Sequence, residues 1–320
     1  MLGFSLVAIL LVLAVGCSVV SIDLTPRIQP LEEQTVHGRG ENKILLMDFS
    51  GLITDEVGSG SLTLGTPTPR VPLLVRVREE LEKASRDPKV RALVIKINSP
   101  GGTVTASDIL FHELDTFRQR NRTPVVAVMM DVAASGGYYL ALAADTIVAH
   151  PTTVTGSIGV ILLTINADGL LQKIGVTTTA IKSGPLKDMG SPLRSLTAEE
   201  RAIFQSVIDD LHGQFVAKLA ERRRIPLDTA KTLADGRVYT AQQALAEKLV
   251  DRIGYIPDAL AVARQAAGLE EARIIVYQRP REYRATYFAG ARGEGDLDIS
   301  LGQVTKLVVA GPRFLYLWWP

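Results

Sequence analysis

The chain has 320 residues, of which 47% are hydrophobic and 22% are charged, so it can bury a sizeable core. Its formal net charge of +1 gives no general attraction to nucleic acid or to an anionic surface. A single cysteine excludes an intramolecular disulfide, and the four histidines are too scattered to form a pair with metal-ligand spacing. We therefore expect neither a nucleic-acid partner nor a metal site.

The first 22 residues carry no charged side chain and are apolar enough, and just long enough, to cross a bilayer. They indicate a signal anchor or a cleaved signal, although the basic segment that normally begins a signal peptide is missing. The stretch "LAVGC" also resembles a bacterial lipobox, which makes Cys17 a candidate for lipidation. Both interpretations place the rest of the chain outside the cytoplasm, and a buried core helix is the alternative.

The next segments read as a linker followed by the start of a folded domain. Residues 23–42 are polar with two prolines, and we interpret them as a linker. The stretch "KILLMDFSGLI" (43–53) is typical of a buried strand, and 58–70, rich in Gly, Ser, Thr and Pro, is typical of a loop. Residues 71–87 then place apolar residues at helical spacing before a charged end.

A pattern of strand, break and helix now occurs twice. An apolar strand at 90–98 is broken by "SPGG", and 105–120 form an amphipathic helix. A second apolar strand at 124–132 is broken by "AASGG", and "YYLALAA" (138–144) begins another helix. Strands that alternate with helices predict an α/β fold with largely parallel pairing. The glycines lie at the strand-to-helix breaks, where backbone amides become available to a ligand.

The remaining elements are shorter strands and then mostly helices. A strand at 146–150 leads into a turn, "TVTGSIGV" (153–160). Thr197 is a predicted N-cap with Glu200 three residues later, the pattern of a capping box at the start of a long helix. We expect further helices at about 227–234, 240–249 and 257–267, a last strand at 272–278, and an irregular tail from residue 279.

Ser135 lies between two alanines and two glycines at the second of these breaks. A buried structural serine needs no such clearance, whereas a nucleophile must let the backbone of a substrate come close. At a helix start, the amide of Gly136 and the helix dipole favour negative charge beside the hydroxyl, which is half of an oxyanion hole. The match to the G-x-S-x-G elbow of hydrolases is poor, because Ala133 holds the first glycine position.

A second Gly-Gly pair ends the preceding strand in "NSPGG" (98–102). Two glycines after a proline let backbone N–H groups approach an oxyanion closely. If the two strands are neighbours, Gly102 and Gly136 could donate from opposite sides. A tight turn at a strand end is the alternative interpretation of either pair alone.

A nucleophilic serine needs a base. His150 ends an apolar strand and precedes a proline, so it reads as a strand-end residue rather than a catalytic one. The other candidates are Lys182 and Lys187 in "TAIKSGPLKDMGSP", and Lys96, which we interpret as an edge or snorkelling residue. A lysine acts as a base only when its amine is neutral, and burial favours that form. The residues themselves do not choose between the candidates.

Five segments resemble, in this order and spacing, the bacterial signal peptide peptidase A family of serine peptidases: "NSPGG", "AASGGYYLALAAD", "TGSIGV", "IKSGPLKDMGSP" and "DGRVYTAQQALAEKLVDRIG". The resemblance covers about residues 43–278. It implies an α/β fold of the Clp protease/crotonase type, built from repeated β-β-α units with a mostly helical C-terminal part. It also implies a peptidase domain over 43–278, preceded by the segments 1–22 and 23–42 and followed by a tail, 279–320.

The same resemblance implies a Ser-Lys dyad. Ser135 matches the nucleophile, and the second lysine of "KSG-x-x-KD", Lys187, matches the base, with the first lysine as the alternative. Gly102 and Gly136 match the amides of the oxyanion hole. Ser157 in "TGSIGV" matches a serine that hydrogen-bonds the lysine amine, and a turn serine is its alternative interpretation.

The function that follows from the resemblance is that of a membrane-associated serine endopeptidase. It would hydrolyse apolar peptides, such as cleaved signal peptides, without a metal or other cofactor. Its catalytic domain would lie in the bacterial cell envelope, outside the cytoplasm, anchored to the membrane. Family members form rings whose subunits share active-site walls, so we expect a homo-oligomer resembling an octameric ring.

Two other functions stay open. A crotonase-type acyl-CoA enzyme on the same fold would use the glycine amides for a thioester enolate and would need no serine nucleophile. A catalytically inactive, membrane-tethered scaffold would present an assembled ring to partners. Labelling by a probe that reacts with active serines separates both from a peptidase.

The C-terminal sequence "GPRFLYLWWP" holds both tryptophans of the chain. An apolar end of this kind is unusual when exposed. We hypothesise that it docks in a neighbour's groove or in the substrate cleft as a product-like peptide. Packing on its own domain, or contact with the bilayer surface, where Trp is common, is the alternative.

Overall fold

The computed structural model describes residues 29–55, 71–280, 285–289 and 313–318. The predicted membrane or lipoprotein segment, with Cys17, lies outside these residues, as does most of the predicted loop at 58–70. Within the described ranges, no helix is both long enough and apolar enough to cross a membrane.

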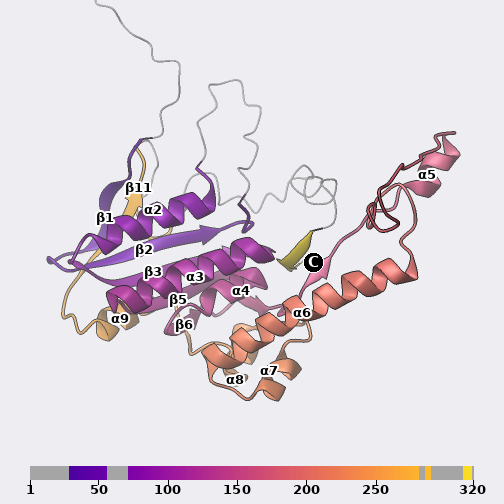
Figure 1. The fold of residues 1–320 in the computed structure, drawn as a ribbon. Helices are drawn as coiled ribbons and strands as arrows, with labels where there is room; N and C mark the ends of the chain where they lie inside the picture. The colour runs from indigo at the N-terminus through magenta and orange to yellow at the C-terminus, as the bar shows by residue number, and fades with distance from the viewer. Residues whose placement is uncertain (1–28, 56–70, 281–284, 290–312, 319–320) are drawn as a thin grey trace, which may run out of the picture. The chain divides into compact units, whose positions relative to one another are not determined.

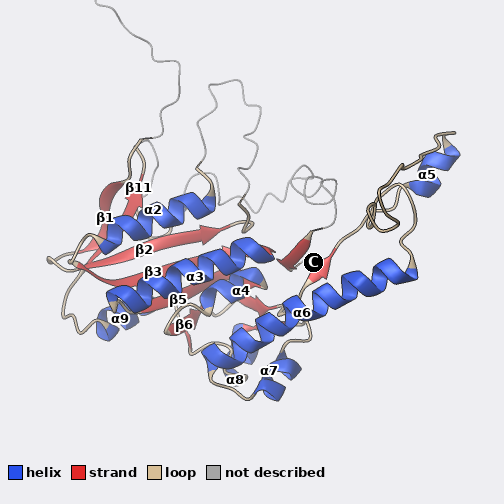
Figure 2. Ribbon diagram, in the orientation of Figure 1, coloured by secondary structure: helices blue, strands red, loops and turns tan. Residues whose placement is uncertain are grey.

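A mostly parallel sheet forms the centre of the described chain (Figures 1 and 2), in the strand order β1-β11-β2-β3-β5-β6-β10, with β7 pairing β5 and β9. Only β1–β11 and β7–β9 pair antiparallel among the described strands of this sheet, which confirms the predicted α/β fold with largely parallel pairing. The strands are β1 (Glu32–Gly38), β2 (Lys43–Ser50), β3 (Val90–Ser99), β5 (Val125–Ala134), β6 (Thr146–Ala149), β7 (Val154–Gly156), β9 (Val238–Thr240), β10 (Arg252–Ile253) and β11 (Arg273–Gln278).

Helices cover both faces of this sheet. On one face, α2 (Leu73–Ser85), α3 (Val104–Asn121) and α4 (Gly136–Ala141) share a core with Leu93 and Ile95 of β3. On the other face, α9 (Ile256–Ala266) packs against a second core that contains Val94. Successive strand residues point to opposite faces, so a strand covered on both sides must be apolar throughout. That explains the near-continuous apolar runs of the sequence.

The C-terminal part is mostly helical, as predicted. It holds α5 (Asp168–Lys173), α6 (Ala198–Arg223), α7 (Leu227–Leu233) and α8 (Ala241–Ala246) in addition to α9. The predicted capping box starts α6: the Thr197 hydroxyl accepts from the amide of Glu200 at 3.2 Å, and the Thr197 amide donates to the Glu200 carboxylate at 2.9 Å. This pair fixes the start of a helix of 26 residues.

Three segments differ from the sequence-based expectation. Residues 32–38, within the predicted linker, form β1, and residues 154–156, within a predicted turn, form β7. Residues 314–317, in the tail expected to be irregular, form β12. All three strands pair with partners that lie far away in the sequence, so the local sequence pattern does not predict them.

Candidate active site

Ser135 stands at the break between β5 and α4, with φ 51° and ψ −113°. A residue with a side chain rarely adopts this conformation, and backbone strain of this kind is often found at functional sites. The Ser135 amide donates to the carbonyl of Gly156 at 2.7 Å, and its carbonyl accepts from the amide of Tyr139 at 2.8 Å. The side chain is buried, and its hydroxyl oxygen has no hydrogen-bond partner among the described residues. The backbone is thus fixed while the hydroxyl stays free for another group.

The two glycine-containing breaks end neighbouring strands at the same edge of the sheet. β3 and β5 pair in parallel, with Ser99 opposite Ala133, and the Asn98 side chain accepts from the amide of Val132 at 3.1 Å. The amide of Gly101 donates to the Ser99 hydroxyl at 3.1 Å. Of the two glycines of "NSPGG", Gly102 is therefore the one whose amide is not used by this turn.

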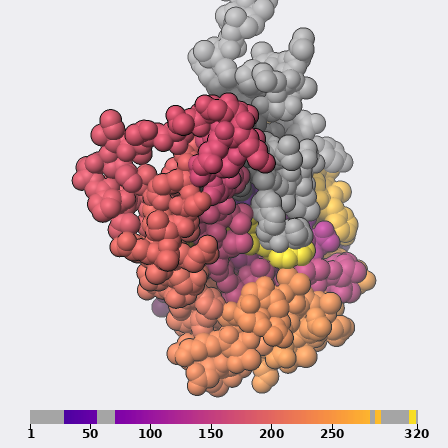
Figure 3. Space-filling model, turned by 90° about the vertical axis from the view of Figure 1, so that its right-hand side faces the viewer, coloured from indigo at the N-terminus to yellow at the C-terminus, as the bar shows by residue number. Residues whose placement is uncertain are grey.

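A peptide strand lies along this edge. It is β12 (Phe314–Leu317), the yellow strand of Figure 1, part of which reaches the surface in Figure 3. In the described residues, β12 runs between β4 (Gly101–Thr103) and β8 (Ile161–Leu162) as the middle strand of a three-stranded antiparallel sheet. Tyr316 lies opposite Gly102, and the amide of Trp318 donates to the carbonyl of Pro100 at 2.9 Å. The tail thus pairs as a strand with two segments of its own chain.

The carbonyl oxygen of Tyr316 lies close to the proposed oxyanion donors. A side-chain carbon placed on Gly136 would lie 3.1 Å from this oxygen, and one placed on Gly101 would collide with it. The same position on Gly101 would be 2.7 Å from the amide nitrogen of Gly136. Only glycines allow another backbone to come this near. The clearance around Ser135 that the sequence suggested is therefore filled by a peptide backbone.

The Tyr316 side chain is enclosed by aromatic residues next to Ser135. It is 1% exposed, stacks on Tyr139 of α4 at 5.3 Å between ring centroids, and lies 4.7 Å from the ring of Phe215 on α6. Its hydroxyl donates to the carbonyl of Leu211 at 3.0 Å, and burial raises its pKa. The sequence analysis did not identify Tyr139, Leu211 or Phe215 as part of this site. Tyr139 could have been suspected, because it lies four residues after Ser135 in "AASGGYY". No sequence pattern connects the other two with Ser135.

Ser157 lies beside Ser135. Ala134 and Gly156 are paired in the parallel strands β5 and β7, so the two serines follow paired strand ends. Ser157 is also buried, has φ 49°, and donates its amide to the carbonyl of Arg237 at 2.7 Å. The predicted nucleophile and the predicted lysine-orienting serine are therefore brought together.

Within the described part of one chain, Lys187 and Ser135 are not hydrogen-bonded to each other. Its side chain is exposed, and neither its amine nor the Ser135 hydroxyl has a hydrogen-bond partner in the described part of the chain. The alternative base, Lys182, donates to the Asp188 carboxylate at 2.8 Å and to the carbonyl of Pro185 at 3.3 Å. That ion pair occupies the amine of Lys182, whereas the Lys187 side chain is exposed, and the assignment of Lys187 as the base stays a prediction.

The other candidate bases are accounted for by structural contacts. Lys96 is 5% exposed in the central strand β3 and forms an ion pair with Asp48 of β2 at 2.9 Å, so its interpretation as an edge or snorkelling residue was wrong. Burying the charge of a lysine is costly unless it is paired, and the Asp48 carboxylate on the neighbouring strand provides that pair. His150 follows β6, lies 2.8 Å from the Thr152 hydroxyl and packs edge-on against Tyr255, as a strand-end residue.

The side chains that commonly bind metal ions do not cluster in the described part of the chain. Across the described ranges, no group of three or more His, Cys, Asp or Glu side chains is placed to hold an ion.

Sequence comparisons find a family model and several similar proteins. Residues 117–270 match the family model of peptidase family S49. An Enterococcus faecium protein that carries the name of a signal peptide peptidase, SppA, is 35% identical over 247 residues, which cover 77% of this chain and 70% of the relative. The chloroplastic serine protease SPPA of Arabidopsis thaliana is 34% identical over 231 residues, which cover 72% of this chain and 33% of that one.

Two solved structures are more distantly similar. A point mutant of ClpP1 from Listeria monocytogenes matches with a TM-score of 0.42 at 17% identity, covering 67% of this chain and 94% of that chain. A point mutant of the membrane-bound stomatin-specific protease 1510-N matches with a TM-score of 0.45 at 16% identity, covering 70% of this chain and 85% of that chain.

Proposed function

The chain belongs to peptidase family S49, a family of serine peptidases, and from this premise we propose that it is an endopeptidase that cuts extended apolar peptides with a Ser135–Lys187 dyad. Cleaved signal peptides are the substrate class that we propose. The observation that carries the proposal is the peptide strand β12, which lies against the glycine-lined edge beside Ser135.

The proposed reaction uses the groups of this edge in two steps. The neutral amine of Lys187 takes the proton of Ser135, whose oxygen attacks the peptide carbonyl. The amides of Gly102 and Gly136 hold the oxyanion that develops, and the ammonium protonates the leaving amine. Water then releases the acyl-enzyme with the same lysine as base. Ser157, beside Ser135, would hydrogen-bond the lysine amine and orient it.

The way in which β12 is held supports an apolar peptide as substrate. Strands on both sides pair with its backbone, a mode of recognition that tolerates many sequences. Three of its four side chains, Leu315, Tyr316 and Leu317, are buried. A substrate that replaced β12 would thus be an extended segment with apolar or aromatic side chains.

We propose that a second copy of the chain supplies Lys187 to each Ser135. The segment that carries Lys187 exposes many apolar side chains, and such a surface is typical of an interface. They are Ile165, Leu170, Ile174, Val176, Ile181, Leu186 and Leu193. An octamer-like ring, anchored to the membrane through residues 1–22 with its catalytic domain outside the cytoplasm, is the assembly that we propose.

The test is peptide hydrolysis by the full chain and its single variants. Ser135→Ala and Lys187→Ala should abolish cleavage of an apolar fluorogenic peptide, whereas Lys182→Ala should keep most of it. Mixing the two inactive variants should restore part of the activity if neighbouring copies complete the dyad. A serine-reactive phosphonate should label Ser135 in the parent and in Lys182→Ala, but not in the two inactive variants. A folded, assembled parent that is neither active nor labelled would overturn the proposal in favour of the scaffold.

A further inference from the structure

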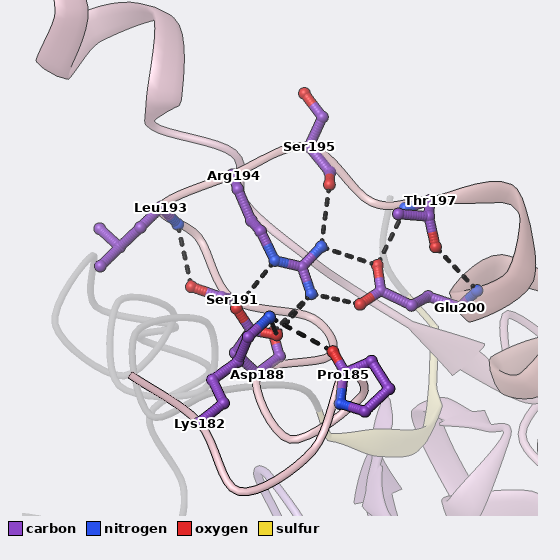
Figure 4. Close-up of polar contacts among 9 residues, drawn as sticks. All are labelled: Lys182, Pro185, Asp188, Ser191, Leu193, Arg194, Ser195, Thr197 and Glu200. Carbon is purple, nitrogen blue, oxygen red and sulfur yellow. Dashed lines mark hydrogen bonds and ion pairs between the residues drawn. The ribbon is translucent and has the colours of Figure 1, made fainter. Parts of the chain in front are cut away.

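Arg194 is the centre of a charged cluster in the segment that carries Lys187 (Figure 4). Its Nε and Nη2 donate to the two carboxylate oxygens of Asp188 at 2.9 and 2.7 Å, and Nη2 also donates to the Asp188 carbonyl at 3.2 Å. Its Nη1 donates to Glu200 at 2.9 Å and to the Ser195 carbonyl at 3.2 Å, and Nη2 contacts the other Glu200 oxygen. One planar guanidinium therefore bridges two carboxylates.

Glu200, on one side of this bridge, belongs to a rigid element. Its side chain is 1% exposed, and it is the third residue of α6, where it completes the capping box with Thr197. It cannot move without disrupting the start of a helix of 26 residues. Arg194 is thus fixed to the body of the protein through this carboxylate.

Asp188, on the other side, is the residue directly after Lys187. Its carbonyl accepts from the amide of Ser191 at 3.0 Å, and the Lys187 amide donates to the carbonyl of Gly184 at 3.2 Å, so the backbone here forms successive turns. In the described residues, the side chain of Arg194 connects these turns to α6, because it donates to Asp188 on one side and to Glu200 on the other. The path runs from α6 through Glu200, Arg194 and Asp188 to the backbone of Lys187.

The charges of the cluster are balanced. The groups that face Asp188 are Arg194 and Lys182, and hydrogen bonds from both hold the pKa of its carboxyl well below its usual range. Arg194, together with the Thr197 amide, lowers the pKa of Glu200 to about 2. Both carboxylates are therefore ionised at neutral pH, and both are occupied by cations of the cluster.

We propose that Arg194 is a positioning residue for Lys187: it clamps Asp188 to Glu200 and so holds the lysine-bearing turn in place on α6. The clamp also keeps the Asp188 carboxylate turned toward Arg194 and Lys182 rather than toward the neighbouring amine. This role rests on the proposed function, in which Lys187 is the base. A lysine cannot replace Arg194, because only the guanidinium fork can bind two carboxylates in a plane.

The test compares Arg194→Met and Arg194→Lys with the parent in the full chain. We expect kcat to fall about 10- to 100-fold in both variants, since a displacement of about 1 Å in a reacting group has an effect of this size. KM should change less than about twofold, because the peptide binds between β4 and β8. Arg78→Met is the matched control: it breaks an ion pair between α2 and α3, in which Nη1 of Arg78 donates to both carboxylate oxygens of Glu113, and it should leave kcat unchanged.

The outcomes separate this inference from the proposed function. If Lys187→Ala stays active, the dyad is wrong and Arg194 has no base to position. If Lys187→Ala is inactive but Arg194→Met keeps its kcat, or Arg194→Lys restores it, the clamp is overturned while the dyad stands. Should Arg194→Met fail to fold, Arg194→Lys, which keeps the charge, decides the question by the same comparison of kcat with KM.

Discussion

Ser135 and Ser157 follow paired ends of two parallel strands, and each has a positive φ, 51° and 49°. The amide of Ser135 donates to Gly156, the residue before Ser157, at 2.7 Å. The two hydroxyl-bearing residues are thereby fixed to each other by backbone contacts alone. In the proposed mechanism one serine attacks and the other orients the base, so their spacing is set before any substrate or second copy arrives.

Replacing Ser135 by alanine should abolish activity without lowering stability. The hydroxyl is buried and has no hydrogen-bond partner in the part of the chain that the structure describes, and an unsatisfied buried polar group costs about 1–3 kcal/mol. We expect the midpoint of thermal unfolding of Ser135→Ala to equal or exceed that of the parent. Ser107→Ala is the control, since its buried hydroxyl donates to the Thr103 carbonyl at 2.9 Å and its loss should lower the midpoint. A clearly less stable Ser135→Ala would mean that the hydroxyl has a structural partner.

Removing the C-terminal strand should open the space between β4 and β8 to a substrate. A chain that ends at residue 312 lacks β12, so an apolar peptide no longer competes with the chain's own segment. We expect a lower KM and a higher rate at low substrate concentration in the peptide assay. A chain that ends at residue 318 keeps β12 and serves as the control. Equal KM values for the two chains would show that β12 does not occupy the substrate site.

Adding a methyl group at Gly136 should block catalysis. A carbon placed there would collide with the Ser107 hydroxyl oxygen and would lie 3.1 Å from the Tyr316 carbonyl oxygen. Gly136→Ala should therefore lower kcat, because both the amide and the approach of a peptide carbonyl are disturbed; loss of one oxyanion donor typically costs about 3–4 kcal/mol. At Gly169 nothing lies within 4 Å, so Gly169→Ala should be neutral. Full activity of Gly136→Ala would exclude this amide from the oxyanion hole.

The Arg194 cluster should stabilise the fold only above a certain pH. The pKa of Glu200 falls from 4.5 to about 2, and the pKa of Asp188 is also lowered, so both groups bind protons less readily when folded. Their stabilisation is fully present above about pH 4.5 and is lost as the pH falls toward about 2. The difference in unfolding midpoint between the parent and Arg194→Met should shrink over that range. A difference that is independent of pH would point to packing instead of charge.

The central elements could be predicted because their signals are local. Buried parallel strands such as β3 and β5 are continuous apolar runs, and the capping box of Thr197 and Glu200 lies within four consecutive residues. The two glycine-containing breaks could be placed at the ends of those strands, whereas the sequence left open whether the strands are neighbours; β3 and β5 do pair. Each of these predictions depends on interactions between near neighbours in the chain or on burial that repeats with the strand period.

The amino-acid sequence by itself determined the α/β class, the family and the identity of the candidate serine, because motif order and hydrophobic period survive without coordinates. Only the tertiary structure decided that Lys96 pairs with Asp48, that Lys182 is occupied by Asp188 while Lys187 is not, and that the tail lies between β4 and β8. These are contacts between residues on different elements or between side chains of one folded turn. These contacts form only when the chain folds and brings the groups together, so a local sequence pattern does not predict them.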